Sequence, residues 1–195
     1  MKIVIAPDSY KESLSALEVA DCIEQGFRAV FPEAEYVKVP MADGGEGTVE
    51  AMIAATAGRR LELEVTGPLG QPVTAFYGLS GDGCSAFIEM AAASGLELLS
   101  VAQRDPRITT SCGTGELICH ALDAGVEHII IGIGGSATTD GGAGMLQALG
   151  VRLIDNNGNE LAPGGAALAQ LAKIDVTNLD ARIARCRIDV ACDVT

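Results

Sequence analysis

The spacing of apolar residues predicts strands and helices in turn over about the first sixty residues. Short apolar runs predict strands, and apolar residues that recur every three or four positions predict helices. Ser15 and Glu18 have capping-box spacing, so the first helix is expected to begin there. Alternation of this kind favours a parallel sheet with helices on its faces. In order, the predicted elements are a strand at 2–6, a helix at 15–31, a strand at 35–40 and a helix at 48–57.

The pattern changes at Gly58. Residues 60–66 alternate strictly between polar and apolar, and two further short apolar stretches at 73–79 and 84–90 follow across glycine-containing turns. Such spacing predicts an antiparallel meander, and we place a domain boundary near Gly58. The later predicted elements are a short helix within 91–99, a helix ending near 124, a strand at 128–131, a helix at 143–149, a strand at 151–155, helices near 164–171 and 178–184, and a strand at the end.

A glycine-rich stretch at 132–144 follows the apolar run 128–131 and contains six glycines. A buried strand that opens into a loop of bare backbone amides is a common way to bind an anionic group, most often phosphate. A second reading is open, because Gly132, Gly134 and Ala137 fit the relaxed dinucleotide pattern and Asp155 lies about twenty residues further on. In a third reading the glycines only permit tight turns.

Three other polar loops lie at predicted strand ends or helix starts, at 8–15, 42–48 and 111–115. Lys11 offers a point charge to an anion, and Asp8 could accept a proton or bind magnesium. Asp43 and Glu46 place two carboxylates on one turn, which suits Mg²⁺. Each segment also has the composition of an ordinary polar turn or helix start. Together they fit phosphoryl transfer, which depends on positioning and charge stabilisation.

Composition and charge exclude several classes of function. The net charge of −13 argues against nucleic-acid binding, which needs a basic surface. No apolar run reaches the ~18 residues of a membrane span, and the N-terminal apolar stretch is too short for a signal peptide, so we expect a cytoplasmic protein without a membrane partner. Six irregularly spaced cysteines and two histidines do not predict a zinc site, redox chemistry or a histidine-based triad.

Four segments together resemble the bacterial type I glycerate kinases: 5–16 (I-A-P-D-S-Y-K-E-S-L-S-A), 42–48 (A-D-G-G-E-G-T), 111–118 (S-C-G-T-G-E-L-I) and 132–150. The resemblance extends from Met1 to Thr195 and is strongest to glycerate 2-kinases. It implies transfer of the ATP γ-phosphoryl group to D-glycerate, giving 2-phosphoglycerate, with Mg²⁺. Members of the family are about twice this length, so the resemblance implies that the chain is an N-terminal portion.

The resemblance also implies an α/β fold with two domains. A flavodoxin-like parallel-sheet domain would begin at residues 1–58, and an inserted, rearranged Rossmann-like domain would occupy 59–195, incomplete at its C-terminus. The implied site residues are catalytic Asp8, Lys11, Asp43 and Asp193, of which Asp43 and Asp193 would bind metal; nucleotide- or phosphate-binding Gly134, Gly135, Ser136, Thr138, Thr139 and Asp140; and substrate-binding Ser9, Gly44, Gly45 and Glu46.

Two readings compete with the kinase. One is an NAD-dependent oxidoreductase that uses the 132–144 loop together with Asp155. The other is a non-catalytic module that binds an anion or nucleotide. The expected small-molecule partners of the kinase are ATP and D-glycerate, and the sequence leaves a homodimer open.

Overall fold

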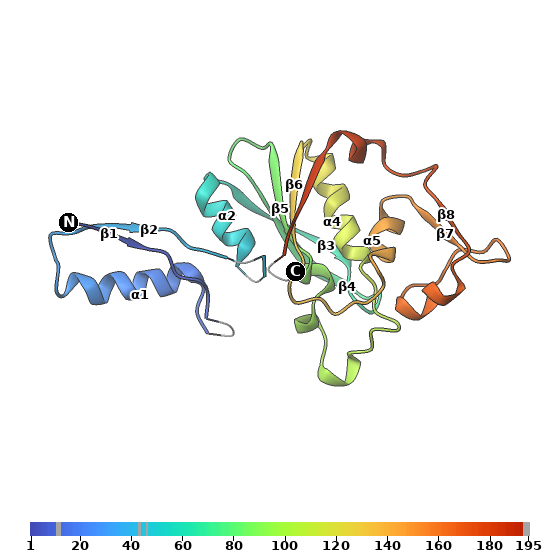
Figure 1. Ribbon diagram of the computed structural model, residues 1–195, viewed down its shortest axis with the longest axis horizontal. Coiled ribbons are helices and arrows are strands. Elements are labelled where there is room, and N and C mark those ends of the chain that lie inside the picture. Colours follow the sequence, from blue (N-terminus) through green and yellow to red (C-terminus); the bar gives the residue numbers. More distant parts are fainter. Residues whose placement is uncertain (11–12, 43, 46, 193–195) are drawn as a thin grey trace.

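The computed structural model describes residues 1–10, 13–42, 44–45 and 47–192. The molecule is elongated, with a small N-terminal unit at one end, a five-stranded sheet with its helices in the middle, and a two-stranded sheet at the other end (Figure 1). The fold is mixed α/β and includes parallel strand pairs, as the alternation of apolar and polar residues predicts.

The N-terminal unit consists of β1 (Lys2–Ile5), α1 (Ala16–Arg28) and β2 (Glu35–Lys38). Its two strands are parallel, with Lys2 opposite Glu35. The capping box predicted at the start of α1 is confirmed, because the Glu18 amide donates to the Ser15 hydroxyl at 3.3 Å and the Ser15 amide donates to the Glu18 carboxylate at 2.8 Å. The helix ends at Arg28, before Pro32.

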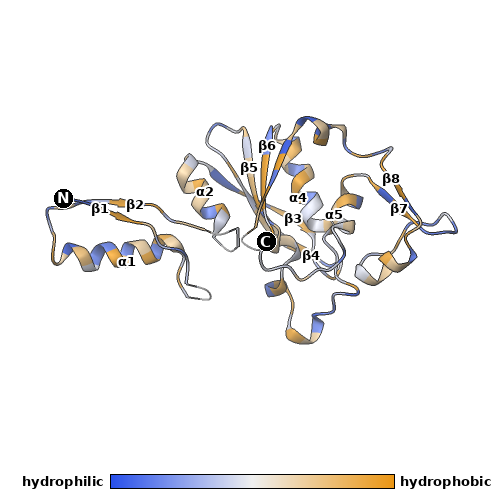
Figure 2. Ribbon diagram, in the orientation of Figure 1, coloured by the Kyte–Doolittle hydropathy of each residue, from blue (hydrophilic) through white to orange (hydrophobic). Residues whose placement is uncertain are grey.

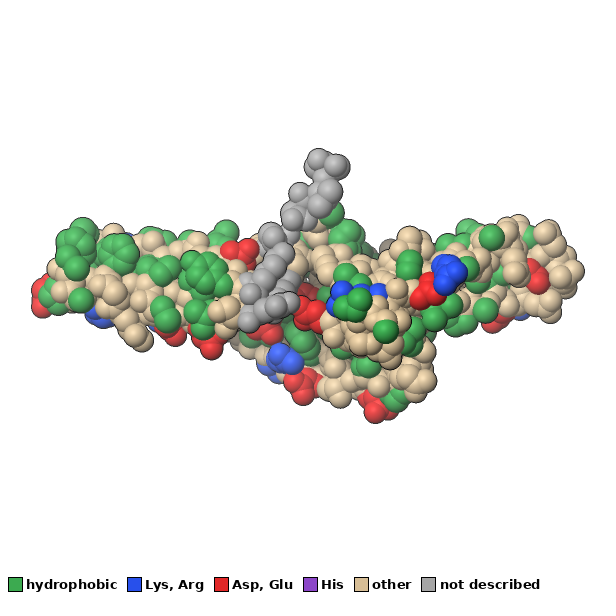
Figure 3. Space-filling view, turned by 90° about the horizontal axis from the view of Figure 1, so that it is seen from below, with side chains coloured by type: hydrophobic (Ala, Val, Ile, Leu, Met, Phe, Trp, Pro, Cys, Tyr) green, Lys and Arg blue, Asp and Glu red, His purple; other side chains and the backbone are tan. Residues whose placement is uncertain are grey.

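The N-terminal unit exposes many large apolar side chains. Val30 is 68% exposed and Val4 58% exposed, although valine is usually buried in a protein of this size. Figure 3 shows hydrophobic side chains gathered over this end of the molecule. A two-stranded sheet with one helix is too small to cover these apolar side chains. The exposed group also includes Tyr10, Leu17, Phe27, Phe31, Val39 and Met41.

The central sheet has the strand order β3-β4-β5-β6-β9. Its antiparallel part is the meander predicted from the alternating pattern, and its parallel part joins β5, β6 and β9. The register places Glu89, Gly132 and Ala191 in one row at the carboxyl ends of the parallel strands. The bounds are β3 (Arg59–Thr66), β4 (Pro72–Leu79), β5 (Ser85–Glu89), β6 (His128–Gly132) and β9 (Arg187–Ala191).

Helices cover both faces of this sheet. Neighbouring residues of a strand point to opposite faces, so Gly78 lies under α2 (Thr48–Thr56) while Tyr77 points to α4 (Cys112–Asp123) and hydrogen-bonds His120 Nδ1 at 3.0 Å. The shorter α3 (Ala91–Ser94) and α5 (Ala143–Ala148) lie on the α4 side. Hydrophobic residues concentrate along β5 and β6 (Figure 2), and buried side chains of the core come from both strands.

Helix α2 packs on the central sheet. Val49 is fully buried there, and both Val49 and Ile53 lie against the site of Gly78, which has no side chain to hold them off. The boundary predicted near Gly58 would assign this helix to the first domain. In the structure the helix contacts the central sheet, and the domain boundary stays a prediction.

The remaining elements lie beyond α5. Strands β7 (Arg152–Ile154) and β8 (Lys173–Asp175) form an antiparallel pair. The helices predicted near 164–171 and 178–184 are 3₁₀ segments, Gly165–Gln170 and Ala181–Arg185, because runs this short gain little from α-helical hydrogen bonds. The helix predicted within 91–99 is α3 followed by a 3₁₀ turn, Leu96–Leu98. Within the described ranges, no helix is long and apolar enough to cross a membrane.

Bare backbone joins the 42–48 segment to the carboxyl edge of the central sheet. A Cβ atom on Gly132 would collide with the Gly44 carbonyl oxygen, and one on Gly44 would lie 2.8 Å from the Ala191 carbonyl oxygen. Gly44 also has a φ of 95°, which disfavours any residue with a side chain. The close approach therefore requires glycine on both sides.

We expect Gly132→Ala to lower the free energy of unfolding by about 1–3 kcal/mol, the usual cost of overpacking a rigid site. Gly26→Ala in α1 is the matched control, since a Cβ there meets no atom within 4 Å and a helical glycine is less stable than alanine by about 0.5–1 kcal/mol. Urea unfolding of both variants measures the difference. Equal stability of the two variants would contradict the contact.

Candidate functional site

The candidate site lies at the carboxyl ends of β5, β6 and β9, where ligands bind in open α/β sheets. Two of the glycine-rich loops predicted from the sequence meet here. A Cβ on Gly134 would lie 2.9 Å from the Cα atom of Gly45, and the Gly134 amide approaches the Gly44 carbonyl at 3.5 Å. The structure thus brings predicted substrate-binding and phosphate-binding glycines into direct contact.

Asp140 is the organising side chain of the 132–144 loop. It is only 2% exposed, and its carboxylate accepts hydrogen bonds from the Ser111 amide at 2.9 Å, the Gly142 amide at 3.0 Å and the Gly144 amide at 3.1 Å. The Ser111 hydroxyl donates to it as well and accepts from the Met145 amide at 3.0 Å. Asp140 was expected to contact phosphate. In the structure its carboxylate accepts hydrogen bonds from amides of its own chain, and the contact with phosphate stays a prediction.

The outer part of the loop is more accessible. Gly134, Gly135 and Thr139 are exposed, and Ser136 and Thr138 are half-buried. The Ser136 hydroxyl accepts from the Thr138 amide at 3.0 Å and lies 3.1 Å from the Thr138 hydroxyl. This part of the loop therefore leaves backbone and hydroxyl groups accessible, while Asp140 is enclosed behind it.

The other predicted residues are distributed as follows. Asp8 is exposed after β1, in the N-terminal unit, and its carboxylate accepts from the Ser9 amide at 2.7 Å. These two residues follow a strand of a different sheet from the one that carries the 132–144 loop (Figure 1). The remaining predicted residues, Lys11, Asp43, Glu46 and Asp193, lie outside the described residues.

Glu89 is a buried acid of this edge that was not predicted from the sequence. It ends β5, is 6% exposed, and accepts a hydrogen bond from the Val49 amide in the first turn of α2 at 2.8 Å. The register places it beside Gly132. An acid that closes an otherwise apolar strand, S-A-F-I-E, is the signal that could have identified it.

A cavity of about 280 Å³ opens beside the loop. It lies between the residues that follow β5 and β6, Met90 and Ile133, and the first turns of the helices that begin at Cys112 and Ala143. Met145 and the Ser111–Asp140 pair complete its wall. The cavity thus adjoins both the buried carboxylate and the exposed part of the loop.

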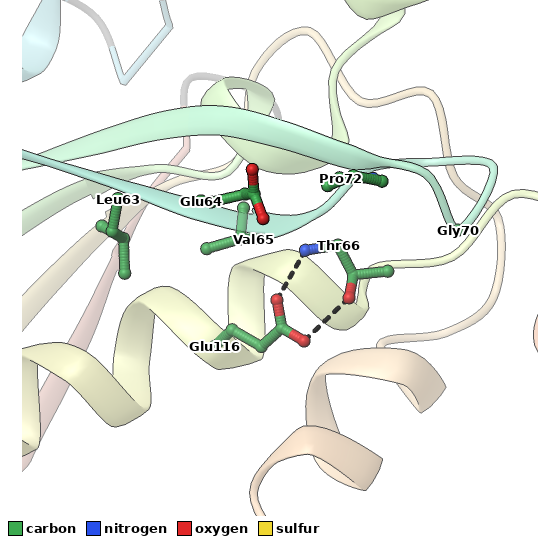
Figure 4. A pocket seen from close by; sticks show the side chains of 7 residues that line it. All are labelled: Leu63, Glu64, Val65, Thr66, Gly70, Pro72 and Glu116. Atoms are coloured by element: carbon green, nitrogen blue, oxygen red, sulfur yellow. Dashed lines mark hydrogen bonds between the residues drawn. The ribbon is translucent and has the colours of Figure 1, made fainter.

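A larger cavity, of about 410 Å³, lies elsewhere, along the edge strand β3 (Figure 4). Its carboxylates are Glu64 and Glu116, and Glu116 accepts from both the amide and the hydroxyl of Thr66, at 2.6 and 2.8 Å. Two acids disfavour an anionic ligand. Burial, with Glu116 nearby, raises the pKa of the neighbouring Cys112 thiol, so this cysteine is not an activated nucleophile.

Asp155, which the dinucleotide reading needs, does not join the site. Asp155 follows β7, in the separate two-stranded sheet, and its carboxylate accepts from the amides of Asn157 and Asn159 in its own turn. The structure therefore does not bring Asp155 to the glycine loop, as the dinucleotide reading needs. In the described part of the chain no three His, Cys, Asp or Glu side chains gather as a metal cluster.

Comparison with known proteins gives consistent relatives. The model of the glycerate kinase family matches residues 3–195. The chain is 66% identical over its whole length to a glycerate kinase of Bacillus subtilis (strain 168) and 67% identical to a glycerate 2-kinase of Escherichia coli (strain K12), covering 51% of each. A crystal structure from Salmonella typhimurium LT2, described provisionally as glycerate kinase 2, superimposes with a TM-score of 0.92 at 73% identity, and the chain covers 53% of it. The chain thus spans about half the length of the relatives it matches.

Removal of the Asp140 charge should destabilise the site. The carboxylate of Asp140 accepts hydrogen bonds from several N–H and O–H groups. An asparagine side chain would place its own N–H group against some of these donors, so we expect Asp140→Asn to lower the free energy of unfolding by about 3 kcal/mol. Ser111→Ala, which keeps the backbone donor and loses only the hydroxyl, should cost about 1 kcal/mol. Urea unfolding compares the two. An Asp140→Asn variant as stable as Ser111→Ala would show that the carboxylate does not hold the loop.

Proposed function

The chain belongs to the glycerate kinase family, and we propose that the whole protein transfers the γ-phosphoryl group of ATP to D-glycerate, giving 2-phosphoglycerate. The contact between the two glycine-rich loops at the carboxyl edge of the parallel strands carries this proposal. Phosphoryl transfer needs the two substrates held in line, with charge stabilisation around them. Two loops of backbone amides that approach from different sides suit that task.

The proposed division of roles follows the two loops. Gly134, Gly135 and the hydroxyls of Ser136, Thr138 and Thr139 bind the nucleotide side, and Asp140 holds them in place. Ser9, Gly44, Gly45 and Glu46 contact glycerate, and Lys11 offsets negative charge on the phosphoryl group or the carboxylate. Asp8, Asp43 and Asp193 supply the base and, for Asp43 and Asp193, the ligands of Mg²⁺, which usually takes only one or two protein carboxylates.

We further propose that the whole protein has two domains. The N-terminal unit begins a flavodoxin-like domain, and the central sheet belongs to an inserted, rearranged Rossmann-like domain. The exposed apolar side chains of the N-terminal unit support this division, because a two-stranded sheet with one helix is not stable alone. The boundary was expected near Gly58, and the packing of α2 favours 42–48.

The partners and the location follow from the same function. ATP and D-glycerate are the proposed small-molecule partners, and neither nucleic acid nor a membrane is expected at a net charge of −13. The cytoplasm is the proposed compartment. An oxidoreductase is disfavoured, because Asp155 follows a strand of a separate sheet and its carboxylate accepts a hydrogen bond within its own turn.

A coupled assay of ADP release by the full-length protein tests the activity directly. We expect turnover with D-glycerate and MgATP, and background rates with L-glycerate or without an acceptor. Analysis of the product by NMR distinguishes 2-phosphoglycerate from 3-phosphoglycerate. Absence of turnover with D-glycerate would overturn the proposal, and oxidation of NADH in its place would support the alternative.

Glu89 should act as a positioning residue, since its carboxylate holds the first turn of α2 and hence the neighbouring 42–48 segment. We expect Glu89→Ala to lower kcat at least about tenfold and to cost about 1–3 kcal/mol of stability. Glu89→Gln keeps an acceptor for the Val49 amide and should restore most of both. Glu97→Ala, at an exposed position, is the matched control. A Gln variant as inactive as the Ala variant would show that the charge, not the hydrogen bond, is required.

A further inference from the structure

We infer that the 280 Å³ cavity beside the 132–144 loop binds the base of the nucleotide, mainly by apolar contact with Met90, Ile133 and Met145. The inference rests on the proposed function, because it takes ATP as the phosphoryl donor. It adds the orientation of ATP. The base lies in the cavity of the proposed Rossmann-like domain, and the phosphates point toward the 42–48 segment.

The position of the cavity fits a nucleotide that spans the edge of the sheet. Met90 directly follows β5 and Ile133 directly follows β6, so the apolar side chains line the carboxyl ends of two neighbouring parallel strands. Met145 closes the cavity from α5. Its volume is below the usual 300–1,000 Å³ of sites that hold a whole drug-sized ligand. The cavity therefore accommodates one part of ATP rather than the whole molecule.

The charge of the wall excludes the anionic parts of the substrates. Asp140 is a wall residue and carries a buried carboxylate, and the described residues that line the cavity include no Lys, Arg or His. Glycerate and the triphosphate both carry negative charge, and either would enter without a counter-charge. A neutral ring system carries no such penalty.

The polar groups deep in the wall are already engaged. The Ser111 hydroxyl donates to Asp140 and accepts from the Met145 amide, and the Thr114 hydroxyl pairs with that of Ser94 at 2.9 Å. A ligand with many hydrogen-bonding groups would have to displace these bonds. Methionine sulfur, in contrast, makes favourable contacts with aromatic rings and adapts to their shape.

The rim of the cavity sets the direction of the rest of the nucleotide. Ser136 and Thr138 line the cavity, and the exposed Gly134, two residues before Ser136, contacts Gly45 of the 42–48 segment. A base in the cavity therefore places its sugar near the two hydroxyls. The triphosphate then reaches the glycine backbone where the two loops meet, which is where glycerate is proposed to bind.

Methionine-methyl NMR of the full-length protein tests the location. With ¹³C-methyl methionine, and with the signals of Met90 and Met145 assigned by Met→Leu substitution, adenosine should shift both signals through the ring current of its base. Met52, on the opposite face of the sheet, is the internal control. Pyrophosphate and D-glycerate should leave Met90 and Met145 in place. Shifts with either of these anions, or none with adenosine, would overturn the inference.

Steady-state kinetics separate this inference from the proposed function. Ile133→Trp fills the cavity and should raise KM for ATP at least about tenfold, with KM for D-glycerate changed by less than about twofold. Ile174→Trp, on the exposed face of β8, is the matched control and should change neither. If the wild-type protein phosphorylates glycerate but Ile133→Trp leaves KM for ATP unchanged, the assignment of the cavity fails and the kinase activity stands. If the wild-type protein does not phosphorylate D-glycerate, the proposed function itself is wrong.

Discussion

The buried carboxylate of Asp140 is the interaction on which this site depends. A charge with 2% exposure is costly unless hydrogen bonds replace its water, and here three backbone amides and one hydroxyl do so. These donors come from the residue that precedes α4 and from the segment that leads into α5. One side chain therefore fixes the starts of both helices, and with them the wall of the cavity between the helices and β6.

The glycines around this carboxylate serve different physical purposes. Gly132, like Gly44 opposite it, is required where two backbones touch, since a methyl group on Gly132 would collide with the Gly44 carbonyl oxygen. Gly141 and Gly142 have φ angles of 62° and 77°, which let the chain turn around Asp140 into α5. Gly134 and Gly135 remain exposed to a ligand. The glycine-rich motif thus serves packing and turning, and it leaves two further glycines accessible.

Local patterns in the sequence predicted much of this structure. Strict alternation identified the meander, capping-box spacing identified the start of α1, and the glycine motif identified the loop that carries the site. Features that depend on distant pairing were not predictable in this way. The role of Asp140 requires Ser111, which only the packing of α4 against α5 brings near, and Glu89 acquires its partner from a helix that precedes it by forty residues. The 3₁₀ segments after α5 have the composition of helices and lack the length to form them.

The late position of β9 in the chain has a consequence for the order of folding. The meander and β6 can form from nearby residues, but β6 gains its second neighbour only after the chain has passed through α5, β7 and β8. Closing such a long loop costs entropy before any pairing repays it, and parallel pairing across it is slow. During synthesis, then, β6 emerges with an open edge, and Gly44 finds its Ala191 contact only when β9 arrives. The carboxyl edge that carries the candidate site therefore gains its β9 part late, although most of its residues are made early.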